Sequence, residues 1–322
     1  MDKFAMSSSP HVRASESTRR IMIDVIIALL PATVCGVYFF GIDALWIILV
    51  CVASAVGTEA VLQKLMRRKV TALDGSAALT GLLLALNLPV MAPGMLWLPF
   101  VGAAFAIAIV KQAFGGIGSN FLNPALAARA LLMVSWPTAM TTWTMPVDAV
   151  SAATPLAALK YGGDALSPYL DMAVGNVGGT IGETSAIALI IGGLYLLIRR
   201  VIDWRIPGVF IATVALFTFI AGPEGLFTGD ALYHMLGGGL MLGAIYMATD
   251  YSSAPMSNTG KIIFALGCGI LTSVIRLWGG FPEGVSYSIL LMNLVVPLLD
   301  KAFKPKLFGT SRRRAKFKGV TE

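Results

Sequence analysis

The 322-residue sequence is poor in charged residues. Only 13% of its residues are Asp, Glu, Lys or Arg, whereas 57% are hydrophobic. A soluble globular domain has about 25% charged and about 45–50% apolar residues. One water-soluble core cannot bury this much apolar surface, so the composition excludes an ordinary soluble enzyme. It indicates a chain that is solvated largely by lipid.

Residues that hold metals or form disulfides are also scarce. The three cysteines, Cys35, Cys51 and Cys268, lie in apolar segments, and none belongs to a Cys-x-x-Cys pair. Of the two histidines, His11 precedes the first apolar run and only His234 follows it. These counts argue against a disulfide framework, an iron–sulfur cluster, a thiolate zinc site or a bis-histidine haem held by this chain alone. The sequence therefore predicts no metal site, and its polar start predicts no cleavable signal peptide.

The net charge of +7 does not indicate a nucleic-acid partner, because the basic residues stand at the ends of apolar runs. If the N-terminus is cytoplasmic, all but three of the 24 lysines and arginines fall in predicted cytoplasmic segments; the exceptions are Arg129, Lys160 and Arg276. This is the distribution that the positive-inside rule describes. We therefore expect a multi-pass membrane protein, with the bilayer as a partner, both termini cytoplasmic and the loop 137–182 outside.

Apolar runs of about 20 residues predict about ten transmembrane helices. The predicted spans are 21–40, 43–63, 75–91, 95–113, 121–136, 183–201, 205–221, 231–250, 260–278 and 284–302. Five spans on each side of the long loop permit an inverted repeat, an arrangement common in transporters. Weak similarity supports it, because Phe121-Leu122-Asn123-Pro124 and Phe281-Pro282-Glu283-Gly284 each precede an apolar helix. Ordinary helix kinks are the alternative explanation of these Asn and Pro residues.

The predicted fold class is thus an all-α polytopic membrane protein with two inverted five-helix repeats. The predicted parts are a cytoplasmic segment 1–20, a first repeat 21–136, an outer loop 137–182, a second repeat 183–302 and a basic cytoplasmic tail 303–322.

Two stretches of the outer loop are candidate binding sites. In the first, Asp148 and Ser151 precede Thr154 among small residues, which would allow an enzyme to approach and modify the Thr154 hydroxyl. In the second, Gly178, Gly179 and Thr180 come before a predicted helix start at Glu183, where backbone N–H groups can bind an anion. The alternatives are a flexible Ser/Ala/Thr loop and a simple turn with a helix cap. No P-loop is present, because no Gly-Lys-Ser/Thr follows.

On the predicted inner side, Asn120 and Asn123 stand three residues apart at a helix start, where their amides suit the mixed donor and acceptor edge of a planar heterocycle. Capping by Asn120, with Pro124 early in the helix, is the structural alternative. Arg129 lies deepest of the ionisable residues in the spans and could balance a buried carboxylate or a flavin charge. As a structural alternative, it could pair with Asp250. The other ionisable candidates at membrane depth or at the span ends are Asp24, Glu59, Asp250 and Asp300.

Five motifs in order along nearly the whole chain resemble the NqrB/RnfD family. They are Gly-Gly-Ile-Gly-Ser-Asn-Phe-Leu-Asn-Pro-Ala-Leu at 115–126, Ser-Ala-Ala-Thr at 151–154, Gly-Gly-Thr-Ile-Gly-Glu-Thr-Ser at 178–185, Met-Ala-Thr-Asp at 247–250 and Gly-Gly-Phe-Pro-Glu-Gly-Val-Ser-Tyr-Ser-Ile-Leu-Leu-Met-Asn at 279–293. Each motif alone is weak, but five in register are specific. The chain length favours the Rnf branch over the longer sodium-pump homologues.

The resemblance implies a urea-transporter-like fold and an FMN joined to Thr154 by a phosphoester, which a dedicated flavin transferase attaches. Ala152 stands where many relatives have glycine in the attachment pattern. It further implies a non-covalent riboflavin near Asn120, Asn123 and Asp250, as in the NqrB branch. The implied partners are the other Rnf subunits, A, B, C, E and G.

The expected function is therefore electron relay within a complex that couples electron transfer between ferredoxin and NAD to Na⁺ or H⁺ translocation. The chain has no dinucleotide fingerprint and no complete active site of its own. The alternative is a secondary transporter or channel for a small polar solute, which rests on the inverted repeat alone.

Overall fold

The structure is a computed structural model, and it describes residues 17–145, 153–162, 166–183, 185–222 and 225–304. Asp148 and Ser151 of the predicted attachment pattern lie outside these residues. The described chain is mostly helical, with one two-stranded antiparallel sheet of β1 (Ala221–Gly222) and β2 (Gly225–Leu226).

The elements before the long loop begin with the 48-residue helix α1 (Thr18–Leu65). Gly41 breaks α1, since its φ of 71° lies in the left-handed region that glycine tolerates. The predicted spans 21–40 and 43–63 therefore meet at this break. The remaining elements are η1 (Ala72–Asp74), α2 (Ser76–Leu86), η2 (Pro93–Met95), α3 (Trp97–Phe105), the π-helix η3 (Ala106–Gln112), α4 (Pro124–Ser135) and α5 (Pro137–Thr141).

Two short helices, α6 (Pro155–Tyr161) and α7 (Tyr169–Val174), lie in the long loop. The elements that follow are α8 (Ala186–Ile198), α9 (Arg205–Ile220), α10 (Ala231–Leu236), α11 (Leu240–Leu242), the π-helix η4 (Gly243–Met247), α12 (Asn258–Trp278) and α13 (Val285–Ala302).

The prediction of one continuous helix over 231–250 is wrong. Three consecutive glycines, 237–239, separate α10 from α11 and η4, which follow one another without a gap. Gly238 and Gly239 have φ values of 71° and 65°, and a Cβ on Gly238 would come within 2.5 Å of the Arg276 guanidinium. Glycine is needed here both for the backbone conformation and for the close approach of Arg276.

Four helical segments of the described residues are long and apolar enough to cross a membrane: Thr18–Leu65, Pro93–Gln112, Asn258–Trp278 and Val285–Ala302. Four shorter apolar helices accompany them: Ser76–Leu86, Pro124–Ser135, Ala186–Ile198 and Arg205–Ile220. The chain is therefore a mostly helical, polytopic membrane protein, as its composition predicts.

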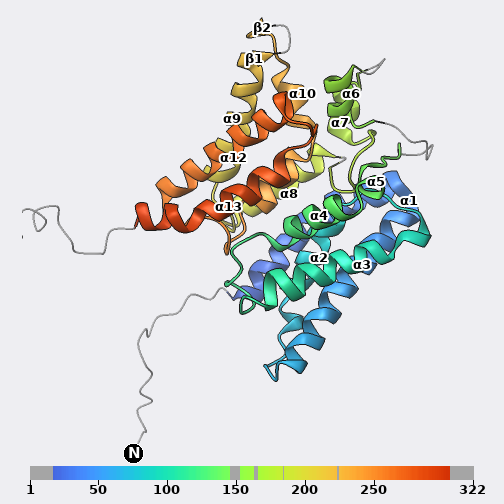
Figure 1. Ribbon diagram of the computed structural model, residues 1–322, viewed down its shortest axis with the longest axis vertical. Helices are drawn as coiled ribbons and strands as arrows, with labels where there is room; N and C mark the ends of the chain where they lie inside the picture. Colours follow the sequence, from blue (N-terminus) through green and yellow to red (C-terminus); the bar gives the residue numbers. More distant parts are fainter. Residues whose placement is uncertain (1–16, 146–152, 163–165, 184, 223–224, 305–322) are drawn as a thin grey trace, which may run out of the picture.

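The helices form two groups that follow the sequence. Figure 1 shows α1 to α5, in blue and green, beside α8 to α13, in yellow to red. Within the groups α1 packs on α2, and α9 packs on α12. Between the groups, α1 contacts α8 and α4 contacts α13. The two cavities described below are lined by residues from both groups.

Candidate functional site

A cavity of about 590 Å³ lies between the two groups of helices. Its apolar wall includes four aromatic side chains: Trp143, Tyr161, Phe281 and Tyr287. The polar side chains in its lining include Asn87, Arg129, Glu283 and Ser286. A mostly apolar cavity with a few converging polar groups is the usual form of a cofactor site. We call it the large cavity.

The polar wall of the large cavity is an ion pair between α4 and the start of α13. The guanidinium of Arg129 contacts Glu283 Oε2 at 2.5 Å and donates to Asn87 Oδ1 at 3.0 Å and Ser286 Oγ at 3.2 Å. Both side chains of the pair are largely buried, with exposed fractions of 8% and 14%. The alternative pairing of Arg129 with Asp250 is thus wrong. The sequence did not predict Glu283 as a site residue, because Glu283 precedes the predicted span 284–302.

Thr154 borders the large cavity. It is the N-cap residue of α6, its hydroxyl oxygen accepts from the Ala157 N–H at 3.3 Å, and its neighbours Ala153 and Ala157 line the cavity. A modifying enzyme has to reach the hydroxyl, but Thr154 is only 2% exposed. The hydroxyl therefore also has a local structural role, because it satisfies a free N–H of the first helical turn.

The C-terminal end of α6 is bound to the turn between α12 and α13. Lys160 Nζ donates to the carbonyls of Ile275, Gly279 and Phe281, and Tyr161 Oη donates to the carbonyl of Gly280 at 2.8 Å. Burial lowers the pKa of Lys160 from its usual value. These contacts join α6, which has Thr154 as its N-cap, to the segment between α12 and α13 that contains Glu283.

The glycine-rich stretch before α8 packs beside Thr154, since a Cβ on Gly178 would lie 3.7 Å from the Ala153 carbonyl. Helix α8 begins at Ala186 with Ser185 as its N-cap, so the predicted start at Glu183 is wrong. The N–H groups of residues 181, 182 and 183 are already bonded to the carbonyls of Leu88, Leu86 and Thr180.

These bonds leave Gly178, Gly179 and Thr180, and not Glu183, as the part of the stretch where an anion could bind. Thr180 is itself buried, and its hydroxyl donates to Glu183 Oε2 at 3.2 Å. Anion binding by these three residues stays a prediction.

A second cavity, of about 100 Å³, contains all three residues predicted for a non-covalent flavin. Asn120, Asn123 and Asp250 line it together, with Lys111 and Tyr246. We call it the small cavity. Its lining includes residues from the starts of α1 and α4 and from the segment after η4.

Asn123, not Asn120, caps α4. Its Oδ1 accepts from the N–H groups of Ala125 and Leu126, while its Nδ2 donates to the Met247 carbonyl at 3.2 Å. Asn120 Nδ2 has the Leu122 carbonyl as its partner, at 3.0 Å. Capping by Asn120 is therefore wrong, while Pro124 does occupy the first helical position.

One partition separates the two cavities. Leu83 of α2 lines the small cavity, and Asn87, the C-cap residue of α2, lines the large one. On α4, Ala125 lines the small cavity and Arg129 the large one. Residues four apart lie about 6 Å apart along a helix. The π-helix η4 completes the partition, because Gly243 and Met247 face the large cavity and Tyr246 the small one. π-Helical turns are frequent at functional sites.

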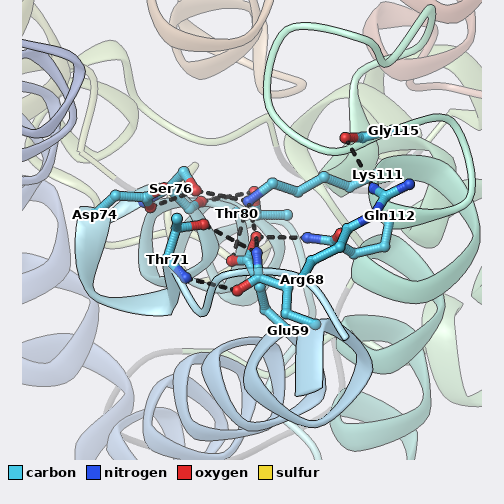
Figure 2. A network of polar contacts seen from close by, with 10 residues as sticks. Glu59, Arg68, Thr71, Asp74, Ser76, Thr80, Lys111, Gln112 and Gly115 are labelled. Atoms are coloured by element: carbon cyan, nitrogen blue, oxygen red, sulfur yellow. Dashed lines mark hydrogen bonds and ion pairs between the residues drawn. The ribbon is translucent and has the colours of Figure 1, made fainter. Parts of the chain in front are cut away.

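A buried polar network lies beside the small cavity. Lys111, at the end of η3, contacts Glu59 of α1 at 2.9 Å and donates to Ser76 Oγ at 2.6 Å, as Figure 2 shows. The two side chains of the ion pair are 4% and 1% exposed. Gln112 Nε2 donates to Glu59 Oε1 at 2.7 Å, and Gln63 Nε2 donates to the same oxygen at 3.3 Å.

The sequence singled out Glu59, whereas Lys111 counted only as one of the basic residues on the predicted cytoplasmic side. Its partner was not visible, because 52 positions separate the two residues in the chain. The other candidates, Asp24, Asp250 and Asp300, also have partners. Asp24 pairs with Arg199 at 3.1 Å, Asp250 accepts from Ser253 Oγ and Asp300 accepts from the Met256 N–H. Among the described residues, no group of three or more His, Cys, Asp or Glu side chains could hold a metal ion.

Comparison with known proteins agrees with the motifs. The D subunit of a Na(+)-translocating ferredoxin:NAD(+) oxidoreductase complex from Acetobacterium woodii is 53% identical over 312 residues, which cover 95% of this chain and 96% of that protein. The D subunit of a proton-translocating ferredoxin:NAD(+) oxidoreductase complex from Clostridium ljungdahlii is 51% identical and covers 96% of this chain and 97% of its own length. The D subunit of an ion-translocating oxidoreductase complex from Stutzerimonas stutzeri is 40% identical over 92% of this chain and 94% of its own.

The model of the NQR2, RnfD, RnfE family matches residues 5–309. Nearly the whole chain is thus shared with proteins of this kind, and the resemblance that the five motifs predict is confirmed: the chain belongs to the NQR2, RnfD, RnfE family.

Proposed function

We propose that this chain is a membrane flavoprotein subunit of an ion-translocating ferredoxin:NAD⁺ oxidoreductase complex, and that it relays electrons through an FMN bound covalently to Thr154. The names of relatives that match almost the full length support the complex. The observation that carries the FMN proposal is the large cavity next to Thr154. Its proposed partners are the other Rnf subunits, A, B, C, E and G, and a flavin transferase during maturation.

The residues of the large cavity fit an FMN. A volume of about 590 Å³ falls within the range of about 300–1,000 Å³ that is usual for small-molecule sites. Trp143, Tyr161 and Phe281 offer apolar faces to a tricyclic ring, while Arg129 and Glu283 offer charges to its polar edge. A flavin supplies the electron-carrying chemistry, and these side chains supply its position and electrostatic surroundings. Because Thr154 is buried as a cap, the start of α6 has to open for the flavin transferase to reach its hydroxyl.

The decisive experiment is peptide mass spectrometry of the purified protein. We expect one FMN adduct on the peptide that contains residues 148–160, together with flavin fluorescence after denaturing electrophoresis. The alternative function, a transporter or channel for a small polar solute, requires no covalent flavin. An unmodified peptide in protein from cells that contain the transferase would contradict the proposal.

The proposal leaves the translocated ion open to either Na⁺ or H⁺. The two relatives of 53% and 51% identity are named for different ions. Overall sequence identity to them therefore does not indicate which ion is translocated.

The proposed topology has ten spans in two inverted repeats, with both termini cytoplasmic and residues 137–182 outside, in an inner membrane. It rests on the distribution of Lys and Arg. Reporter fusions at residues 160 and 315 are expected to report opposite sides of the membrane. Equal accessibility of the two fusions would contradict the ten-span topology.

We also propose that the small cavity takes a non-covalent riboflavin, since Asn120, Asn123 and Asp250 line it together. Its volume of about 100 Å³ is below the usual range for a ligand of this size, so its walls have to move apart on binding.

Denaturing extraction is expected to release riboflavin from the wild-type protein and much less from Asn120→Leu. This variant keeps the Asn123 cap of α4. Asn123→Leu loses that cap and costs about 1 kcal/mol of stability as well, so it is the less specific probe. Extraction of no free flavin from the wild type would contradict the site.

A further inference from the structure

One oxygen of Glu283 has no hydrogen-bond partner among the described residues. Its Oε2 is held by Arg129 at 2.5 Å, whereas its Oε1 is buried and unpaired. Buried carboxylate oxygens nearly always have donors, because an unsatisfied one costs free energy. Since Glu283 lines the large cavity, a rotation of its carboxyl group would present this atom to a donor on a bound molecule.

The groups next to Glu283 define the kind of edge that would bind there. Arg129 brings a positive charge to the same wall, and Ser286 accepts from Arg129 through its oxygen, so its own O–H remains able to donate. An acceptor, a hydroxyl donor and a cation thus lie together in a cavity that aromatic side chains also line. This set matches a flat ring with an N–H flanked by carbonyl oxygens, which is the pyrimidine edge of an isoalloxazine.

We propose that Glu283 Oε1 accepts a hydrogen bond from the flavin N3–H and that the balance of charge between Arg129 and Glu283 sets the reduction potential of that flavin. The inference rests on the proposed function, because it needs the FMN of Thr154 in the large cavity. Both residues are positioning residues that tune the cofactor and take no part in bond breaking.

The sign of each effect follows from charge. Two-electron reduction of the isoalloxazine at neutral pH takes up one proton and leaves one negative charge on the ring. A nearby guanidinium stabilises that charge and a nearby carboxylate opposes it, more strongly in a buried site than in water. Removing Arg129 should therefore lower the potential, and removing the charge of Glu283 should raise it.

Redox titration of the covalent flavin in the purified complex tests the proposal. Arg129→Gln is expected to shift the midpoint potential to more negative values and Glu283→Gln to more positive values. The double variant Arg129→Gln/Glu283→Gln restores neutrality and is expected to return the potential toward that of the wild type. Asp203→Asn is the control: Asp203 pairs with Arg205 and Lys261, away from the cavity lining, and its loss should leave the potential unchanged.

Single variants leave one buried charge unpaired and can fail to fold, so a comparison between two neutral double variants tests the hydrogen bond separately. Arg129→Gln/Glu283→Gln keeps an acceptor at position 283, and Arg129→Gln/Glu283→Leu does not. Deuteration of N3–H identifies the resonance Raman bands that report on this group. Compared with the wild type, these bands should change in the second variant only. Identical bands in both would overturn the N3–H contact.

Different outcomes contradict the proposed function and the contact with Glu283. No gel fluorescence in any protein, the wild type included, would remove the proposed function. Retained fluorescence with unmoved potentials, or with shifts of the same sign in both single variants, would overturn this inference alone.

Discussion

Thr154→Asn is expected to abolish the flavin fluorescence of the denatured protein and to leave the protein folded in the membrane. Asparagine has no hydroxyl for a phosphoester, yet it is among the best N-cap residues. It can therefore still accept from the Ala157 N–H at the start of α6. The measurement is in-gel fluorescence, scaled to the amount of protein in the membrane fraction.

Thr154→Ala is the matched comparison. It loses the hydroxyl and also the cap, at a cost of about 1 kcal/mol. Its gel should therefore also show no flavin fluorescence, and the protein should be less stable than Thr154→Asn. Other hydroxyls of the same region, such as Thr141 and Thr142, already donate to the carbonyls of Pro137 and Thr138. Undiminished fluorescence in Thr154→Asn, or an adduct on another residue, would refute the attachment site and most of the functional proposal.

Lys111→Met is expected to destabilise the protein strongly. Glu59 is 1% exposed, and Lys111 is its only cationic partner among the described residues. Removing one partner of a buried ion pair typically costs about 3–5 kcal/mol, because the other charge stays buried without compensation. Thermal unfolding of the purified protein in detergent should show a large drop in midpoint temperature.

Two variants isolate the cause of this effect. Glu59→Gln/Lys111→Met removes both charges and should regain most of the lost stability, since Gln112 and Gln63 can still hydrogen-bond an amide at position 59. Lys261→Met breaks a partly exposed pair with Asp203 and should cost only about 0–1 kcal/mol. A Lys111→Met protein as stable as Lys261→Met would show that the Glu59–Lys111 pair is not a structural element.

The predicted helices differ from the observed ones where side chains form hydrogen bonds with backbone N–H or C=O groups. The span 121–136 shortens to α4 because Asn123 caps it at Pro124. The span 231–250 divides at three glycines, where Arg276 Nη2 donates to the carbonyls of Gly237 and Gly238. Apolar content predicts that a segment is buried, but not whether a side chain from elsewhere in the fold will take over its backbone hydrogen bonds.

The sequence by itself determined the class of this protein and its family. Long apolar runs cannot be solvated by water, so the membrane class is a local property that can be recognised along the chain. The motifs that identify the family are likewise local, and so is the grouping of Asn120 with Asn123.

Only the tertiary structure decided which charges meet and where space remains. Arg129 pairs with Glu283 across 154 positions of the chain, and Lys111 with Glu59 across 52. Such pairs form because a charge withdrawn from water must find whichever opposite charge the packed helices bring within reach. The two cavities have the same origin: each is lined by side chains from several helices, so its volume depends on how those helices pack rather than on any one segment.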